Sequence, residues 1–172
     1  MPSIGHVAVG AAARRLCGKD LSPKQLVCVL TLLSAASLLP DADGIAFRLG
    51  IPYGAPLGHR GASHSLTAAA VIGLLAGLAG KAFGLPPRRV TLWAAAVAAS
   101  HGLLDTLTDG GLGVALLWPF SQRRFFAPWR PIPVAPIGLG MISRRGLEVL
   151  EFELLFFSPL FLYAFWPRRR PG

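Results

Sequence analysis

Charged residues are scarce in this sequence, and acidic residues are the scarcer kind. Only 15% of the 172 residues are charged, whereas an ordinary soluble domain carries about 25%. The chain is 53% hydrophobic and has a mean hydropathy of +0.54. This composition favours a membrane protein over a soluble one. The length is typical of one domain, so we expect a single domain over residues 1–172.

The excess of positive charge does not indicate a nucleic-acid partner. The formal net charge is +9 because 17 basic residues oppose 8 acidic ones. The basic residues occur in short clusters that apolar segments separate, at 14–15, 88–89, 123–124, 144–145 and 168–170. Such clusters are typical of loops between membrane helices, whereas a nucleic-acid binder favours a basic stripe with interleaved polar residues. We therefore expect the lipid bilayer as a partner and no nucleic acid.

Cysteine is nearly absent, which excludes a disulfide framework. The two cysteines, Cys17 and Cys28, form no metal or redox motif, and Cys28 lies within an apolar segment. The N-terminus lacks the basic region and small-residue cleavage site of a secretory signal peptide. We therefore expect His6 to remain in the mature protein.

Apolar segments predict an all-α protein, a membrane-embedded bundle of about five helices. The expected helices cover residues 3–16, 25–39, 61–80, 90–108 and 147–166, and Pro40 ends the second of them. Only the third and fourth approach the roughly 20 residues of a membrane span, so a soluble helical protein with an apolar core is the alternative. If the basic loops 14–24 and 81–89 face the cytoplasm, the chain crosses its membrane several times.

Histidine is also rare, and its few positions coincide. Under this topology all four histidines fall at the outer end of the bundle: His6, His59, His64 and His101. Six of the eight carboxylates fall there too: Asp41, Asp43, Asp105, Asp109, Glu148 and Glu151. Ionisable groups at membrane depth are costly and by default mark function. The pattern predicts one polar site, facing the outer side of the membrane.

Three motifs at this end offer metal ligands. In SHGLLDTLTDGG, His101 and Asp105 are four residues apart, which places them about 6 Å apart on one helix face. The segments DAD (41–43) and HRGASHS (59–65) add carboxylates and imidazoles, and this mixture suits zinc. Each motif alone has a structural alternative, such as a hydrogen-bonded pair, a solvated turn or a surface loop. Their joint occurrence predicts a metal site.

The motifs GHVAVG, LLPDAD, HRGASHS, SHGLLDTLTDGG and WPF, in this order, resemble those of the YdjM-like family of prokaryotic inner-membrane proteins. The resemblance spans about residues 1–130. It implies a metal-dependent hydrolase related to the helical fold of zinc-dependent phospholipase C and P1 nuclease. The ligands it implies are His6, Asp41, His59 or His64, His101 and Asp105. Because those enzymes have a second H-x-x-x-D or H-x-x-x-E set that this chain lacks, we expect one or two zinc ions.

The predicted reaction is hydrolysis of a phosphoester in a phospholipid or lipid phosphate. The metal would lower the pKa of a bound water to about 7. Asp43 would orient that water or accept its proton. Arg60, Arg123 and Arg124 would bind the anionic group, because guanidinium groups match phosphate geometry.

Two other functions remain open. One is a metal-binding transporter or sensor without hydrolytic activity, which should show a polar path through the bundle. The inner halves of the third and fourth expected helices carry no ionisable residue, which disfavours this alternative. The other is a structural membrane protein whose polar cluster only holds helices together. The sequence leaves the substrate and the oligomeric state undetermined.

Overall fold

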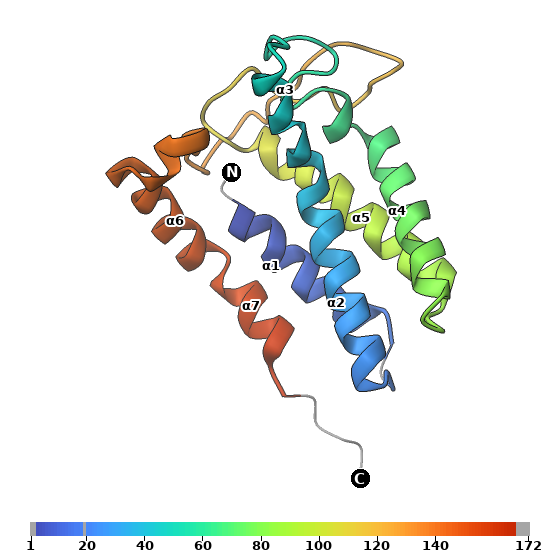
Figure 1. Cartoon of the computed structure of the whole chain (residues 1–172). Helices are drawn as coiled ribbons and strands as arrows, with labels where there is room; N and C mark the ends of the chain where they lie inside the picture. The colour runs from blue at the N-terminus through green and yellow to red at the C-terminus, as the bar shows by residue number, and fades with distance from the viewer. Residues whose placement is uncertain (1–2, 19, 168–172) are drawn as a thin grey trace.

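Antiparallel helices build the protein, and their ends on one side carry the polar motifs. The computed structural model describes residues 3–18 and 20–167, which form an all-helical bundle (Figure 1). Its α-helices are α1 Ser3–Ala13, α2 Pro23–Leu38, α3 Ile45–Arg48, α4 Leu66–Lys81, α5 Pro87–Thr106, α6 Arg144–Phe156 and α7 Ser158–Phe165. Short 3-10 helices add η1 Arg14–Leu16, η2 Leu39–Gly44, η3 Ala62–His64 and η4 Gly138–Ile142.

Helix α2 begins with a full capping box and ends close to where the sequence predicted, but the chain stays helical beyond it. The side chain of Ser22 accepts a hydrogen bond from Gln25 N, and the Gln25 side chain accepts one from Ser22 N. The α-helix ends at Leu38, before Pro40, as the sequence predicted. The chain tightens into η2 there and continues helically to Arg48. Proline is tolerated in the first turn of a helix, where its missing N–H has no partner to lose.

Helices α4 and α5 pack closely because glycine lines their interface. Gly73 and Gly77 are buried on α4. A Cβ at Gly73 would lie 2.6 Å from Thr91 O and 2.5 Å from the Cβ of Ala95. This contact holds α5 beside α4 along their length, and so places the C-terminal end of α5 next to η3, just before α4 (Figure 1).

Replacing Gly73 with leucine is therefore expected to lower the free energy of unfolding by about 3 kcal/mol, since the clash involves backbone atoms that cannot rotate away. Thermal unfolding in detergent measures this. Ala70→Leu is the matched control, because Ala70 is exposed on the same helix. Equal destabilisation by both variants would contradict the packing described here.

Helix α1 lies at the centre of the bundle and packs through alanines. Ala8, Ala11, Ala12 and Ala13 are buried, and α1 contacts α2, α5, α6 and α7. Gly10 allows the closest approach, since a Cβ there would lie 2.8 Å from Leu33 O. The small side chains bring the N-terminal turn of α1, and His6 with it, close to α5.

The expected single helix over 147–166 is wrong, because the segment folds as two helices. Helix α6 ends at Phe156 and α7 begins at Ser158. Pro159 lies in the first turn of α7. A proline inside a continuous helix would remove one hydrogen bond and clash with the preceding turn. The break leaves Phe157 buried and lets α7 lie along α1.

Apolar side chains remain exposed on the outer faces of the bundle. On α4, Val71, Leu74, Leu75 and Leu78 are all more than half exposed. Among the described residues one helical stretch, Pro23–Arg48, is long and apolar enough to cross a membrane, and Leu66–Lys81 is a shorter apolar helix. The expectation of several membrane crossings is therefore not supported by helix length. The basic cluster 168–170 lies outside the described residues.

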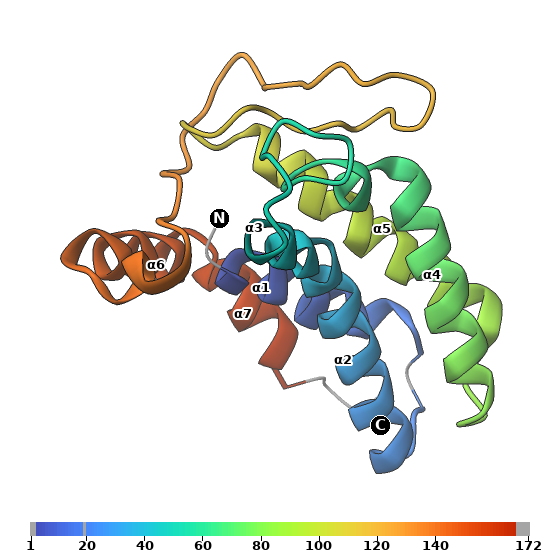
Figure 2. The ribbon, with the colours of Figure 1, turned by 45° about the horizontal axis from the view of Figure 1, so that its top comes forward.

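One end of the bundle collects the start of α1, the end of α2 with η2 and α3, the start of α4, and the end of α5 (Figures 1 and 2). The long connection between α5 and α6 covers the same end (Figure 2). Two isolated bridges within this connection, between Thr108 and Ile132 and between Val114 and Phe125, pair its outgoing and returning parts. The convergence of polar motifs that the sequence predicted is found at this end.

Candidate metal centre

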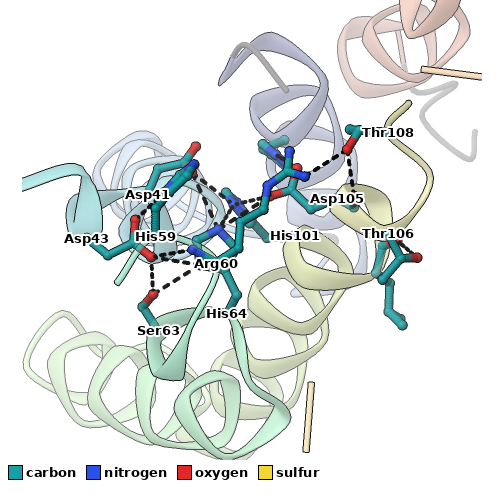
Figure 3. A network of polar contacts seen from close by, with 12 residues as sticks. Asp41, Asp43, His59, Arg60, Ser63, His64, His101, Asp105, Thr106 and Thr108 are labelled. Atoms are coloured by element: carbon teal, nitrogen blue, oxygen red, sulfur yellow. Dashed lines mark hydrogen bonds and ion pairs between the residues drawn. The ribbon is translucent and has the colours of Figure 1, made fainter. Parts of the chain in front are cut away.

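Four side chains from three elements meet at this end of the bundle. Asp41 comes from η2, His64 from η3, and His101 and Asp105 from α5 (Figure 3). Each offers one ligand atom, and these atoms all lie within 4.8 Å of one another. His64, His101 and Asp105 are buried, and Asp41 is partly open to solvent. The sequence-predicted ligands Asp41, His64, His101 and Asp105 are thus brought together.

The spacing of the four ligand atoms fits a tetrahedral ion. Nε2 of His64 and Nε2 of His101 are 3.1 Å apart. Asp41 Oδ1 lies 3.5 Å from the first and 3.4 Å from the second, and Asp105 Oδ2 lies 3.4 Å and 3.8 Å from them. Zinc ligands at 2.0–2.1 Å in a tetrahedron are separated by roughly 3.3 Å. Five ligand–ligand distances therefore match the edges of one zinc-sized tetrahedron.

Both imidazoles are held with Nε2 free for a cation. His101 Nδ1 lies 2.6 Å from the backbone oxygen of Ser37, so Nδ1–H must donate and Nε2 keeps its lone pair. His64 Nδ1 lies 3.1 Å from Asp43 Oδ2 and 3.0 Å from the hydroxyl of Ser63. Metal-binding histidines are characteristically fixed in this way by a carbonyl or carboxylate on the other ring nitrogen.

Arg60 supports Asp105 from the opposite side of the site. Its Nε lies 3.2 Å from Asp105 Oδ2, and its Nη1 donates to Thr108 Oγ1 and to the backbone oxygen of Gly110. Its backbone adopts φ of 59°, a left-handed conformation that non-glycine residues rarely adopt. Strain of this kind costs on the order of 1 kcal/mol and persists where the surroundings impose it. Here Arg60 N donates to Asp43 Oδ2, which fixes the turn between the two motifs.

The net charge of the site is negative, as a site for a divalent cation requires. Three carboxylates, from Asp41, Asp43 and Asp105, face one guanidinium, so the set carries two net negative charges when the imidazoles are neutral. Burial lowers the pKa of His64, but the carboxylates of Asp105, Asp41 and Asp43 outweigh it and raise that pKa to about 10. The cluster therefore attracts positive charge, which a divalent ion would supply.

His6 forms a second part of the site. Its ring stacks on that of His101, with centroids 3.6 Å apart and planes 12° from parallel. Its Nε2 lies 3.8 Å from Asp105 Oδ1, the carboxylate oxygen that the tetrahedral set does not use. Both ring nitrogens are buried, and within residues 3–18 and 20–167 neither has a hydrogen-bond partner. Buried polar atoms are normally satisfied, so His6 is suited to binding a cation that Asp105 would bridge.

A cavity of about 350 Å³ opens onto this centre. Asp41, His59 and Arg60 form its polar side, and Phe47 and Tyr53 continue the wall from the α3 side. The connection between α5 and α6 closes the opposite side. The cavity is large enough for part of a small ligand.

Comparison with known proteins establishes the family. The model of the YdjM inner membrane protein family matches residues 1–170. The chain belongs to the YdjM inner membrane protein family. It is also 39% identical to the inner membrane protein YbcI of Escherichia coli (strain K12), over 99% of this chain and 100% of that protein. No solved structure matches the chain significantly.

Membership of the YdjM family confirms the resemblance that the sequence motifs indicated. It implies association with a membrane, in agreement with the exposed apolar faces. Kinship with the phospholipase C and P1 nuclease fold stays a prediction, since no solved structure supports it.

In this YdjM-family chain the carboxylate of Asp43 is already hydrogen-bonded to protein groups. The sequence analysis had instead expected it to orient the attacking water or to accept its proton. Its carboxylate accepts hydrogen bonds from Arg60 N, from Ser63 Oγ and from His59, whose Nδ1 lies 2.6 Å from Asp43 Oδ1. With His59 and His64 it also forms a second group that could hold a metal. The short distances fit hydrogen bonds better than metal ligation, so Asp43 orients His59 and His64 (Figure 3).

The arginines expected to bind substrate have other contacts. Arg124 donates to five backbone oxygens, those of Tyr53, Ala55, His59, Arg60 and Gly113. It therefore ties the α5–α6 connection to the loop before η3. The guanidinium of Arg123 lies over the ring of Phe125 on an exposed loop. Neither arginine lines the cavity, whereas Arg60 does while pairing with Asp105.

Three other acidic residues that were expected at the site lie at the surface, and a different one is buried near it. Glu148 is exposed and pairs with Arg144, and Glu151 is exposed. Asp109 accepts a hydrogen bond from Val134 N at the surface. Instead Glu153, which the sequence analysis missed, is fully buried and accepts a hydrogen bond from Gly5 N, beside His6. Burial raises the pKa of Glu153 to about 7. Its position on the buried face of α6 with Gly146 and Val149 was the signal that could have identified it.

Proposed function

We propose that this chain is a membrane-bound metal-dependent hydrolase that cleaves the phosphoester of a phospholipid or lipid phosphate. The observation that supports it most is the set of two imidazoles and two carboxylates at tetrahedral spacing, open to a cavity through Asp41. A mixed nitrogen and oxygen set suits zinc. A bound divalent ion would supply a polarised phosphoryl oxygen and an activated water.

The residues around the cation have distinct roles in this proposal. His59 lines the cavity, and its Nδ1–H donates to Asp43 because a carboxylate can only accept. Its Nε2 is therefore left as an acceptor that can take the proton of the attacking water. Arg60 holds Asp105 in place and contributes positive charge to the cavity wall for an anionic substrate.

The alternative of a transporter or sensor has less support. A conduit requires polar groups along the bundle axis, but below the site the buried core is apolar. It contains residues such as Val29, Leu33, Val90, Ala94 and Val97, and among the described residues its buried members include no acidic, basic or histidine side chain.

The test is a substrate screen with the zinc-loaded protein in detergent. Phosphatidic acid, phosphatidylglycerol, p-nitrophenyl phosphate, p-nitrophenyl acetate and a peptide are compared. We expect phosphate-ester cleavage that Asp41→Asn lowers more than 100-fold. The exposed, distant Asp20→Asn is the matched control and should leave it unchanged. Cleavage of only the acetate or peptide would retain a hydrolase but contradict the phosphoesterase. No turnover by a zinc-replete protein would reject the hydrolase and leave the transporter or sensor.

A further inference from the structure

The cavity at the metal centre has one polar side and one apolar side. Asp41, His59 and Arg60 lie on the polar side. The segment before and within η4 supplies apolar lining through Val134, Pro136, Ile137 and Met141, and Phe47 of α3 adds a ring beside His59. A cavity of this kind is complementary to an amphiphile, with a charged head at the cation and a hydrocarbon chain against the apolar wall.

Exposed apolar side chains of α3 and η4 and their flanks, called here the rim, lie within two residues in sequence of residues that line the cavity. On the α3 side Ile45 is 61% and Leu49 is 67% exposed. On the η4 side Leu139 is 87% and Ile142 is 79% exposed. A soluble surface rarely concentrates such side chains, and this chain belongs to an inner membrane protein family. Lipid is therefore the partner that covers this rim.

The apolar lining of the cavity and the exposed apolar side chains of η4 are adjacent in the chain. This arrangement identifies the kind of ligand that the lining can bind. Ile137 is both a lining residue of the cavity and 57% exposed at its edge. It leads directly into Leu139 and Ile142 of η4. Apolar residues therefore follow one another in the chain from the cavity lining at Ile137 to exposed positions of η4.

We propose that Phe47, Ile137 and Met141 bind the first methylenes of the substrate's hydrocarbon chain, and that η4 and α3 let this chain enter from the bilayer. The inference rests on the proposed function for its reaction and assigns the chain-binding part of the same site. These three residues determine the preference for a long chain, whereas Asp41, His64, His101 and Asp105 act on the head group.

A series of alkyl phosphates tests the chain preference. Ethyl, butyl, hexyl and octyl phosphate are supplied below their critical micelle concentrations to the zinc-loaded protein. Each added pair of buried methylenes is expected to raise kcat/KM by roughly tenfold. Ile137→Ser and Met141→Ser should flatten this dependence, with a loss of kcat/KM that is smallest for ethyl phosphate and grows with chain length to octyl phosphate. Leu75→Ser, 57% exposed on α4 before substitution, is the matched control and should retain the full dependence.

A labelling experiment gives a readout that does not need turnover. Phosphatidic acid with a diazirine in its acyl chain is incorporated with the protein into phosphatidylcholine vesicles and photolysed. Adducts are expected within 134–142, and excess octyl phosphate should suppress them while adducts on α4 persist. Such labelling without hydrolysis would reject the proposed function and retain the chain-binding wall. A kcat/KM independent of chain length, or adducts at 134–142 that octyl phosphate does not suppress, would overturn the inference.

Discussion

Replacing Asp105 with alanine is expected to abolish metal binding and to lower the free energy of unfolding of the metal-free protein by about 3–5 kcal/mol. The side chain of Asp105 is 1% exposed and that of Arg60 is 2% exposed, and Arg60 Nε lies 3.2 Å from Asp105 Oδ2. The substitution leaves a buried guanidinium without its charge partner. Equilibrium dialysis against zinc and chemical unfolding in detergent measure the two effects.

The double variant Arg60→Leu/Asp105→Ala separates these effects. Removing both charges should restore much of the stability, because neither buried charge is then left alone. Zinc binding should stay lost, since Asp105 supplies a ligand oxygen. If Asp105→Ala retains full zinc stoichiometry, the interpretation of His101 and Asp105 as a shared ligand pair is wrong.

The second large expected effect is a difference in zinc affinity between variants of two neighbouring aspartates, Asp41 and Asp43. Asp41→Asn is expected to weaken zinc binding more than 100-fold, because the amide cannot replace the carboxylate as a charged ligand. Asp43→Asn should weaken it about 10–100-fold, the usual range for a residue that only orients a ligand. Asp41 Oδ1 lies within 3.5 Å of both ligand nitrogens, whereas Asp43 contacts the far nitrogen of His64. Competition with a chromophoric chelator measures both affinities.

Asp20→Asn is the control, since Asp20 is exposed and belongs to neither group. A larger loss for Asp43→Asn than for Asp41→Asn would place the ion in the other group of candidate ligands, formed by Asp43, His59 and His64. Equal losses would mean that the two carboxylates are both ligands.

The helical periodicity and the positions of the histidines predicted the four side chains that meet, but also placed Asp109, Glu148 and Glu151 with them. The i,i+4 spacing of His101 and Asp105 holds on α5, and the position of Asp41 at the end of α2 brings it to the same place. Pro40 correctly marked the end of the α-helix, but the 3-10 turn that follows was not predicted, because a proline that ends an α-helix can also lie in the first turn of the next helical segment. Asp41 reaches the site within that turn.

The supporting contacts were beyond sequence reasoning, because they depend on backbone groups and on pairs far apart in the chain. The oxygen of Ser37 fixes the ring of His101, and any residue type at 37 could supply it. Arg60 and Arg124 matched the chemistry of phosphate binding, but the fold uses Arg60 for Asp105 and Arg124 for five carbonyls. Glu153 reaches Gly5 across 148 positions of sequence, which no local motif records.

X-ray absorption at the zinc edge, combined with elemental analysis of the purified protein, tests the metal centre most directly. We expect at least one tightly bound zinc per chain, with four nitrogen or oxygen neighbours at about 2.0–2.1 Å and the outer scattering of two imidazoles. His101→Ala should remove the imidazole contribution of one ligand together with most of the zinc. A folded protein that takes up no zinc, or an ion surrounded by six oxygens without imidazole, would contradict a centre built from Asp41, His64, His101 and Asp105.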